Sequence, residues 1–237
     1  MKSKGNLYLI PCTLGDNEPL EVLPITIKET IDHLNIFIVE NEKTARRFIK
    51  KIAPSKSQPS LKLFVLNKHT EDTDFPDFLN PCLHGKHVGV ISEAGCPGIA
   101  DPGADIVKIA HDKNIKVVPL VGPSSILLAL MASGMNGQSF AFNGYLPIDK
   151  GDRKQELRRL ERASFENNQS QVFIETPYRN NKMLEDITSV LANDTQICVA
   201  CDITLSTEFI KTKTAIQWKK NMVDLHKRPT IFIIHKS

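Results

Sequence analysis

The residues that point most directly to chemistry lie in one run, from Gly89 to Gly103. The run begins as a short apolar strand, breaks into a loop of glycines and prolines, and ends at Asp101-Pro102, a pair typical of a helix start. A loop just beyond the carboxyl end of a strand in an α/β sheet is a usual place for a ligand. We therefore interpret the run as a ligand-binding loop; the alternative is an ordinary strand-to-helix connection, which is usually shorter.

Two further turns of glycine and proline follow predicted strands, Thr13-Leu14-Gly15 and Gly122-Pro123-Ser124-Ser125. If the strands are parallel, these turns and the first loop converge on one cleft. A lining of backbone N–H and C=O groups suits a small polar ligand, and a helix start at the two serines offers free amides to a carboxylate. The sequence contains no P-loop, no G-x-G-x-x-G, no H-E-x-x-H and no G-x-S-x-G, which argues against P-loop phosphoryl transfer and Rossmann-type hydride transfer.

Composition indicates a soluble globular protein of 237 residues, 41% hydrophobic and 24% charged. No run approaches the roughly 18 apolar residues of a membrane span, and the apolar run 6–11 is too short for a signal peptide, so we expect a cytoplasmic protein. Five scattered cysteines argue against a disulfide framework. Cys198 and Cys201 lie in an apolar strand, where residues three apart face opposite ways, and we interpret them as core thiols.

Charge leaves the partner open, because a net charge of +3 is too small to prove nucleic-acid binding. Basic residues do cluster in two predicted helices, over 46–51 and 153–162. Each cluster could steer an anionic partner or could be an ordinary solvated helix face.

The order of elements predicts an α/β protein. Strands expected at 6–10, 36–39, 61–66, 89–91 and 115–120 alternate with helices, which favours a mostly parallel sheet covered by helices on both faces. In the second half the expected strands are short and partly antiparallel, so it should form a mixed α/β lobe. These second strands are expected at 139–142, 172–175, 196–201, 208–212 and 230–235. We place the two lobes at 1–121 and 122–237.

The run from Val88 to Gly103 resembles the signature of the tetrapyrrole methylase superfamily. Within it, the run is similar to the branch that methylates a cytidine ribose 2′-hydroxyl in ribosomal RNA. Segments 121–125, 142–147 and 175–179 look like later motifs of that branch, in the same order. The resemblance covers the chain from Leu7 to Ile234. It implies a two-lobed α/β methyltransferase that binds S-adenosylmethionine between its lobes and is usually a homodimer.

Carried over position by position, the resemblance implies two sets of site residues. The expected cofactor-binding residues are Leu14, Gly95, Cys96, Pro97, Gly98, Ile99, Ser124, Ser125, Pro229 and Thr230. The candidates for catalysis, as a base or as a cation for the developing oxyanion, are Glu40, His69, Glu175 and Arg179. No metal site is expected.

Each catalytic candidate also has a plainer interpretation. Glu40 could cap the helix that follows it, His69 could be a surface loop residue, and Glu175 and Arg179 could simply pair with each other.

The chain departs from the branch where the substrate is expected. The branch has an acidic E-D-T-R stretch where this chain has 40–43 (E-N-E-K), a histidine-rich motif reduced here to 68–70, and a histidine where this chain has Tyr178. These departures affect the expected substrate side, whereas the cofactor loops are kept. On the resemblance, RNA methylation is the leading hypothesis. The alternatives are a methyltransferase acting on a tetrapyrrole or other small acceptor, and a cofactor-binding protein without catalysis.

Overall fold

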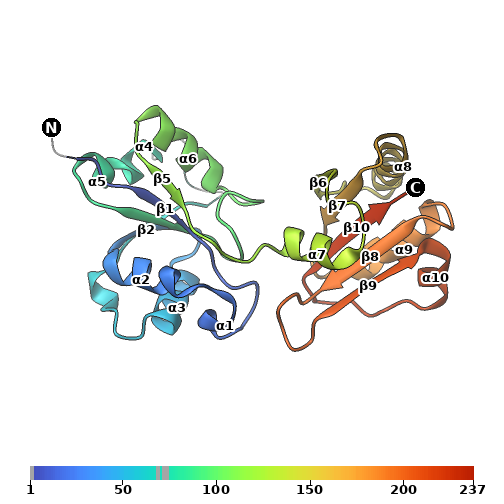
Figure 1. Cartoon of the computed structure of the whole chain (residues 1–237), viewed down its shortest axis with the longest axis horizontal. Helices are drawn as coiled ribbons and strands as arrows, with labels where there is room; N and C mark the ends of the chain where they lie inside the picture. Colours follow the sequence, from blue (N-terminus) through green and yellow to red (C-terminus); the bar gives the residue numbers. More distant parts are fainter. Residues whose placement is uncertain (1–2, 68–69, 71–74) are drawn as a thin grey trace. The chain divides into compact units, whose positions relative to one another are not determined.

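The computed structural model describes residues 3–67, 70 and 75–237. The chain divides into two compact units, Met1–Ser124 (unit 1) and Ser125–Ser237 (unit 2). Figure 1 shows each unit as a sheet with helices packed against it. Among the described residues, no helix is both long enough and apolar enough to cross a membrane.

Unit 1 is built on a five-stranded sheet in the order β3-β2-β4-β1-β5. Every neighbouring pair in it is parallel. The strands are β1 (Leu7–Ile10), β2 (Ile36–Val39), β3 (Lys62–Val65), β4 (Val88–Ile91) and β5 (Val117–Pro119). Because all the strands run the same way, the loops that follow them meet at one edge, the carboxyl edge of the sheet.

Helices cover both faces of this sheet, as the alternating pattern predicted. They are α1 (Pro19–Val22), α2 (Ile25–His33), α3 (Glu42–Ile52), α4 (Phe75–Phe78), α5 (Asn80–Leu83) and α6 (Gly103–Asp112), with a 3₁₀ turn at Gln58–Ser60. One core cluster joins α2 and α3 to the sheet through Ile31 and Ile49. A second cluster joins α4 and α6 to it through Phe78 and Ile106.

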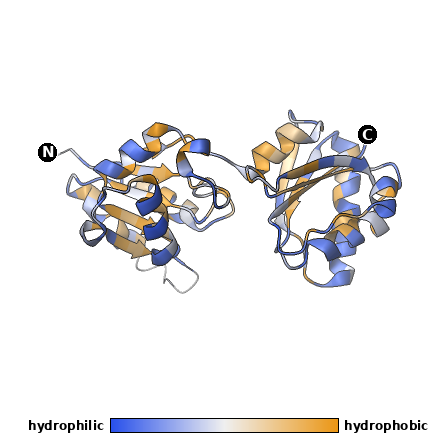
Figure 2. Cartoon of the chain, turned by 90° about the horizontal axis from the view of Figure 1, so that it is seen from below, coloured by the Kyte–Doolittle hydropathy of each residue, from blue (hydrophilic) through white to orange (hydrophobic). Residues whose placement is uncertain are grey.

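Unit 2 is built on a mixed sheet in the order β6-β7-β10-β8-β9, in which only the β6–β7 pair is parallel. The strands are β6 (Phe140–Tyr145), β7 (Ser170–Ile174), β8 (Gln196–Cys201), β9 (Phe209–Thr214) and β10 (Thr230–His235). The helices are α7 (Ser125–Ser133), α8 (Lys150–Asn167), α9 (Asn180–Val190) and α10 (Ala215–Lys220). Figure 2 shows the apolar strands inside both units.

The core of unit 2 lies between its sheet and the helices α8, α9 and α10, around Trp218, Phe173 and Phe232. The predicted core role of the two strand cysteines is confirmed, because both are buried. Burial raises the pKa of Cys201 to about 11, so this thiol stays protonated and unreactive at neutral pH.

Two local predictions were wrong in detail. Asp101 is not the cap of α6, which begins at Gly103 with Pro102 before it. The Asp101 carboxylate instead accepts hydrogen bonds from the amides of both Gly98 and Gly103, so it folds back onto its own loop. The single helix expected at 78–83 is two short helices, α4 and α5.

Candidate functional site

The loops after β1 and β4 are joined at the carboxyl edge of unit 1. The amide of Cys12 donates a 2.9 Å hydrogen bond to the carbonyl of Gly95, and the buried hydroxyl of Ser92 donates to the same carbonyl at 2.7 Å. Two donors on one oxygen fix the position of the second loop against the first. The predicted convergence of these turns therefore has a specific structural basis.

Glycine is required where the turns meet. Gly95 has φ +70°, and a Cβ there would lie 3.2 Å from both the Leu14 side chain and the Pro123 carbonyl. At Gly122 a Cβ would fall 2.2 Å from Cβ of Pro11, well inside van der Waals contact. Gly95 and Gly122 thus let the turns approach one another more closely than a side chain at either position would allow.

Cys96 anchors the third turn to the second. Its thiol lies 3.4 Å from the carbonyl of Pro123 and 3.8 Å from that of Gly122. Partial burial, together with the negative charge of Asp101, raises the pKa of the Cys96 thiol. The residue is therefore a protonated donor that holds the loop, and it is not an activated nucleophile.

The tip of the β4 loop is held from within. Asp101 receives the amide of Gly98 at 2.5 Å and that of Gly103 at 2.9 Å, and Gly98 has φ +77°. The side chain of Ile99 is 55% exposed at this tip. An exposed apolar side chain on a fixed loop is available to a ligand, in keeping with the predicted role of residues 95–99.

Glu40 follows β2 at the same edge. Burial raises the pKa of its carboxyl, and the negative charges of Asp101 and Glu93 raise it further. The interpretation of Glu40 as a helix cap is wrong, because Asn41 caps α3: its side-chain oxygen accepts from the amides of Lys43 and Thr44. Glu40 therefore has no capping duty, and its raised pKa suits a proton acceptor.

Of the remaining catalytic candidates, Glu175 and Arg179 lie in unit 2, and the third is outside the described residues. In unit 2, Glu175 is buried and binds Arg179 Nη2 at 2.7 Å; the same carboxylate oxygen accepts the amide of Thr176. The two side chains do pair, as the plainer interpretation held, and the pair fixes the guanidinium. His69 lies outside the described residues.

The cofactor candidates of unit 2 occupy element ends. Ser125 begins α7, and Thr230 begins β10, with the Thr230 hydroxyl donating to the carbonyl of Arg228. The carbonyl of Pro229 accepts the amide of Asp202. Their contact with a cofactor stays a prediction.

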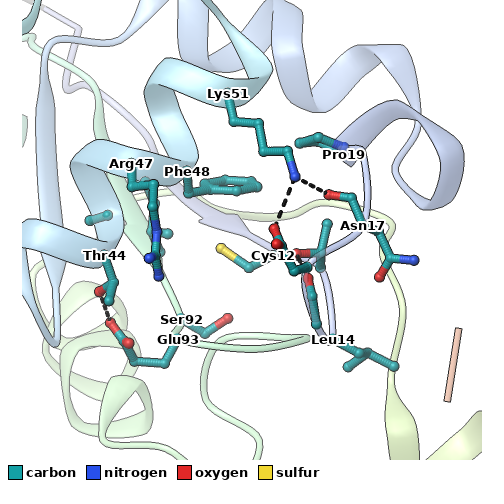
Figure 3. A pocket seen from close by; sticks show the side chains of 15 residues that line it. Cys12, Leu14, Asn17, Pro19, Thr44, Arg47, Phe48, Lys51, Ser92 and Glu93 are labelled. Atoms are coloured by element: carbon teal, nitrogen blue, oxygen red, sulfur yellow. Dashed lines mark hydrogen bonds and ion pairs between the residues drawn. The ribbon is translucent and has the colours of Figure 1, made fainter. Parts of the chain in front are cut away.

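A cavity of about 460 Å³ adjoins the edge in unit 1, and the sequence did not predict it. The β1 loop, the end of β4 and helix α3 form its walls (Figure 3). The residues that sequence reasoning missed are Thr44, Arg47, Phe48 and Lys51. The basic pattern of α3 was visible, but only the fold places this helix beside the loops. The described residues contain no cluster of side chains suited to a metal ion.

Comparison with protein-family models assigns this two-sheet α/β chain to a family. A family model described as Tetrapyrrole (Corrin/Porphyrin) Methylases matches residues 28–217. The chain belongs to this family, and the predicted methyl transfer from S-adenosylmethionine is confirmed at the level of the family.

Individual proteins agree with this assignment. The Ribosomal RNA small subunit methyltransferase I of Buchnera aphidicola is 28% identical over 237 residues, covering 99% of this chain and 79% of that protein. The protein of the same name from Vibrio cholerae is 28% identical, covering 86% of this chain and 67% of that protein.

A solved structure agrees in fold. The uroporphyrin-III C-methyltransferase of Thermus thermophilus, complexed with S-adenosylhomocysteine, is 14% identical with a TM-score of 0.59, and the match covers 98% of each chain. The predicted fold class is confirmed.

Proposed function

We propose that this protein methylates ribosomal RNA of the small subunit, with a ribose 2′-hydroxyl as the acceptor. The observation that carries the proposal is the similarity to named small-subunit ribosomal RNA methyltransferases, which extends over 99% of the chain in one relative. The solved tetrapyrrole enzymes share the fold at much lower identity. Sequence similarity therefore favours the RNA branch of the family over the tetrapyrrole branches.

The loops at the edge of unit 1 fit the methyl donor. Leu14 and Pro123 lie so close to Gly95 that a Cβ there would crowd both of them. Because Gly95 has no side chain, the backbone of the loop can approach a ligand closely. We assign the donor to the β4 loop, to Leu14 and to Ser124; Ser125, Pro229 and Thr230 remain predicted contacts. When bound, S-adenosylmethionine supplies a methyl group that is already strongly electrophilic.

The residues of this chain then have to position and deprotonate the acceptor. Glu40 is our candidate for the base that takes the proton of the ribose hydroxyl, because its pKa is raised toward the range where a carboxylate accepts protons well. Arg179 is the candidate cation for the developing oxyanion, with Glu175 as its positioning partner. His69 stays a candidate on sequence grounds alone.

The substrate is tested by mapping ribose methylation in small-subunit ribosomal RNA from cells with and without the gene. We expect one 2′-O-methyl group to be missing in the disrupted strain and restored by the wild-type gene. Restoration should fail with Glu40→Ala. An unchanged methylation map would refute the proposed substrate.

A small acceptor is the second candidate, because the matching family model is described by corrin and porphyrin methylases. Methyl transfer from labelled S-adenosylmethionine to a tetrapyrrole by the purified protein, with an unchanged RNA map, would favour it. Turnover on either acceptor would exclude the third hypothesis, a cofactor-binding protein without catalysis.

We further propose that the protein works as a homodimer, as the resemblance implies, and that it does so in the cytoplasm. Light scattering on the purified protein should then give about twice the 26.5 kDa of one chain. A mass of one chain at micromolar concentration would refute the dimer.

A further inference from the structure

The cavity beside the β1 loop has the size of a small-molecule site. Its volume of about 460 Å³ falls within the roughly 300–1,000 Å³ usual for ligand pockets. It lies wholly within unit 1, and Leu14 and Ser92 on its walls also belong to the turns assigned to the methyl donor. A molecule bound here would therefore lie next to the donor loops.

Two cations line one wall of the cavity. Arg47 and Lys51 are four residues apart on α3 and so lie side by side on one face of the helix. In the described part of the chain, no hydrogen bond or ion pair holds the Arg47 guanidinium. Lys51 Nζ donates to the Asn17 carbonyl at 2.8 Å and pairs with Asp16 at 3.0 Å and Glu18 at 3.4 Å, but the Asp16 side chain is fully exposed. Such solvent-exposed pairs are weak, so a bound anion can replace them.

An aromatic ring lies between the cations. Phe48 presents its ring to the cavity between Arg47 and Lys51 (Figure 3). An aromatic face beside basic side chains is the usual arrangement for single-stranded nucleic acid, in which a base stacks on the ring and a phosphate meets the cations.

The end of β4 brings negative charge to the cavity, next to α3 (Figure 3). The Glu93 carboxylate lines the cavity and accepts a hydrogen bond from the Thr44 hydroxyl. A carboxylate disfavours a bare inorganic anion but can accept an exocyclic amino group of a base. The combination of two cations, one ring and two carboxylates, Glu93 and the fully exposed Asp16, thus fits a nucleotide better than a free phosphate.

We propose that this cavity binds one nucleotide of the RNA strand, with its base stacked on Phe48 and its phosphate at Arg47 and Lys51. The inference rests on the proposed function and deepens it. It assigns part of RNA recognition to α3, next to the methyl-donor loops.

The test compares two double variants that each remove two positive charges from unit 1. The cavity variant, Arg47→Ala/Lys51→Ala, removes both cations that line the cavity. The control variant, Lys50→Ala/Lys108→Ala, removes two exposed lysines that do not line it. The probe is a fluorescein-labelled, single-stranded 12-nucleotide RNA followed by anisotropy at several salt concentrations. S-adenosylmethionine affinity is measured by calorimetry on the same samples, and its retention shows that the variants are folded.

We expect the cavity variant to bind RNA at least tenfold more weakly and the control variant to lose less than threefold. The slope of log K against log salt should fall by about 0.7 in the cavity variant, the value for one phosphate on a single strand. Equal losses in both variants would mean diffuse attraction and overturn the proposal. Loss of S-adenosylmethionine affinity in the cavity variant would assign the cavity to the cofactor and overturn it as well.

A second variant separates stacking from charge. Phe48→Leu keeps an apolar side chain against the core but removes the ring, and it should weaken RNA binding at least fivefold with the salt slope unchanged. Unaltered binding would refute the stacking role. If the wild-type protein methylates RNA while all these variants bind it normally, the inference fails and the proposed function stands. If the wild-type protein binds no RNA, both fail.

Discussion

The two units treat their charged side chains differently. In unit 2, Arg153 and Asp186 form an ion pair with only 8% and 3% of their side chains exposed, and the buried Asp202 carboxylate binds the partly exposed Arg228. In unit 1 the ion pairs lie at the surface, for example Lys28–Asp32 and Lys51–Asp16. Unit 2 uses charge to fix its own elements, whereas unit 1 leaves charge accessible around its loops.

This difference indicates where a ligand can act. A buried ion pair has already lost its water and cannot exchange a partner without a large cost in free energy, so the charges of Arg153 and Asp186 are structural. The charged side chains at the carboxyl edge of unit 1 are not held in buried ion pairs. Arg47 faces a cavity, and the carboxyl of Glu40 has a raised pKa. We therefore expect substitutions in the buried Arg153–Asp186 pair to cost stability and substitutions at the unit 1 edge to cost binding.

The largest expected effect comes from Arg153→Met. Arg153 donates twice to Asp186 Oδ2, at 3.0 and 2.6 Å, and also to the carbonyls of Pro147 and Ile148. Its removal leaves the buried carboxylate with only Lys182, at 3.7 Å, as a cation, which should lower the free energy of unfolding by about 3–5 kcal/mol. Trp218, the only tryptophan, is buried in unit 2, so its fluorescence in urea reports this loss.

The matched control is Arg159→Ala on the same helix. Its ion pair with Glu156 leaves 59% of the arginine side chain exposed, so the change should stay within about 0.5 kcal/mol. Equal effects of the two substitutions would contradict the distinction between buried and exposed pairs.

The next effect is expected at Gly95→Ala in unit 1. A methyl group would crowd Leu14 and Pro123, and the positive φ would be strained by about 1–2 kcal/mol. We expect the affinity for S-adenosylmethionine to fall at least tenfold in a calorimetric titration. Gly137→Ala is the control, because a Cβ there meets nothing within 4 Å. Unchanged affinity in Gly95→Ala would show that the loop does not hold the donor.

The smallest effect on stability is expected at Glu40→Gln. A carboxyl whose pKa is raised in the folded state favours folding only while it is protonated. Its contribution is present below the ordinary glutamate pKa and is lost as pH rises through the folded-state pKa. The uncharged variant should therefore be slightly more stable than wild type at pH 7 and equal to it at low pH.

The methyltransferase activity of Glu40→Gln should fall, although its stability at pH 7 should rise. If Glu40 is the base, methyl transfer is lost even where the protein is more stable. A fully active Glu40→Gln, or one less stable than wild type at pH 7, would contradict this account.

Much of the fold could be predicted because its signals are local. The apolar run Ile36–Val39 and the final strand Thr230–His235 have the predicted bounds, and the alternation of strand and helix was sufficient to predict the parallel sheet of unit 1. Helix α10 (Ala215–Lys220) was missed, although Thr214 and Gln217 form a capping box that the sequence displays. This Thr-x-x-Gln pattern is a sequence signal for the start of a helix.

The site was less predictable because it depends on contacts between distant segments. Glycines in the turns suggested a cleft, but the hydrogen bond from the Cys12 amide to the Gly95 carbonyl joins residues far apart in the chain. The cavity arises because α3 packs beside the β1 loop. The helical pattern of α3 does not indicate that it lies next to this loop. Asp101 looked like a cap because Asp-Pro often is one, yet the local geometry of the loop turns its carboxylate onto the amides of Gly98 and Gly103.

The central claim is tested most directly by methyl transfer in vitro. Small ribosomal subunits from a strain lacking the gene are incubated with the purified protein and methyl-labelled S-adenosylmethionine. The account predicts that about one methyl group enters each small-subunit RNA, on a ribose, and that subunits from wild-type cells accept none. No incorporation into the unmethylated subunits, with the protein folded and the cofactor bound, would contradict it.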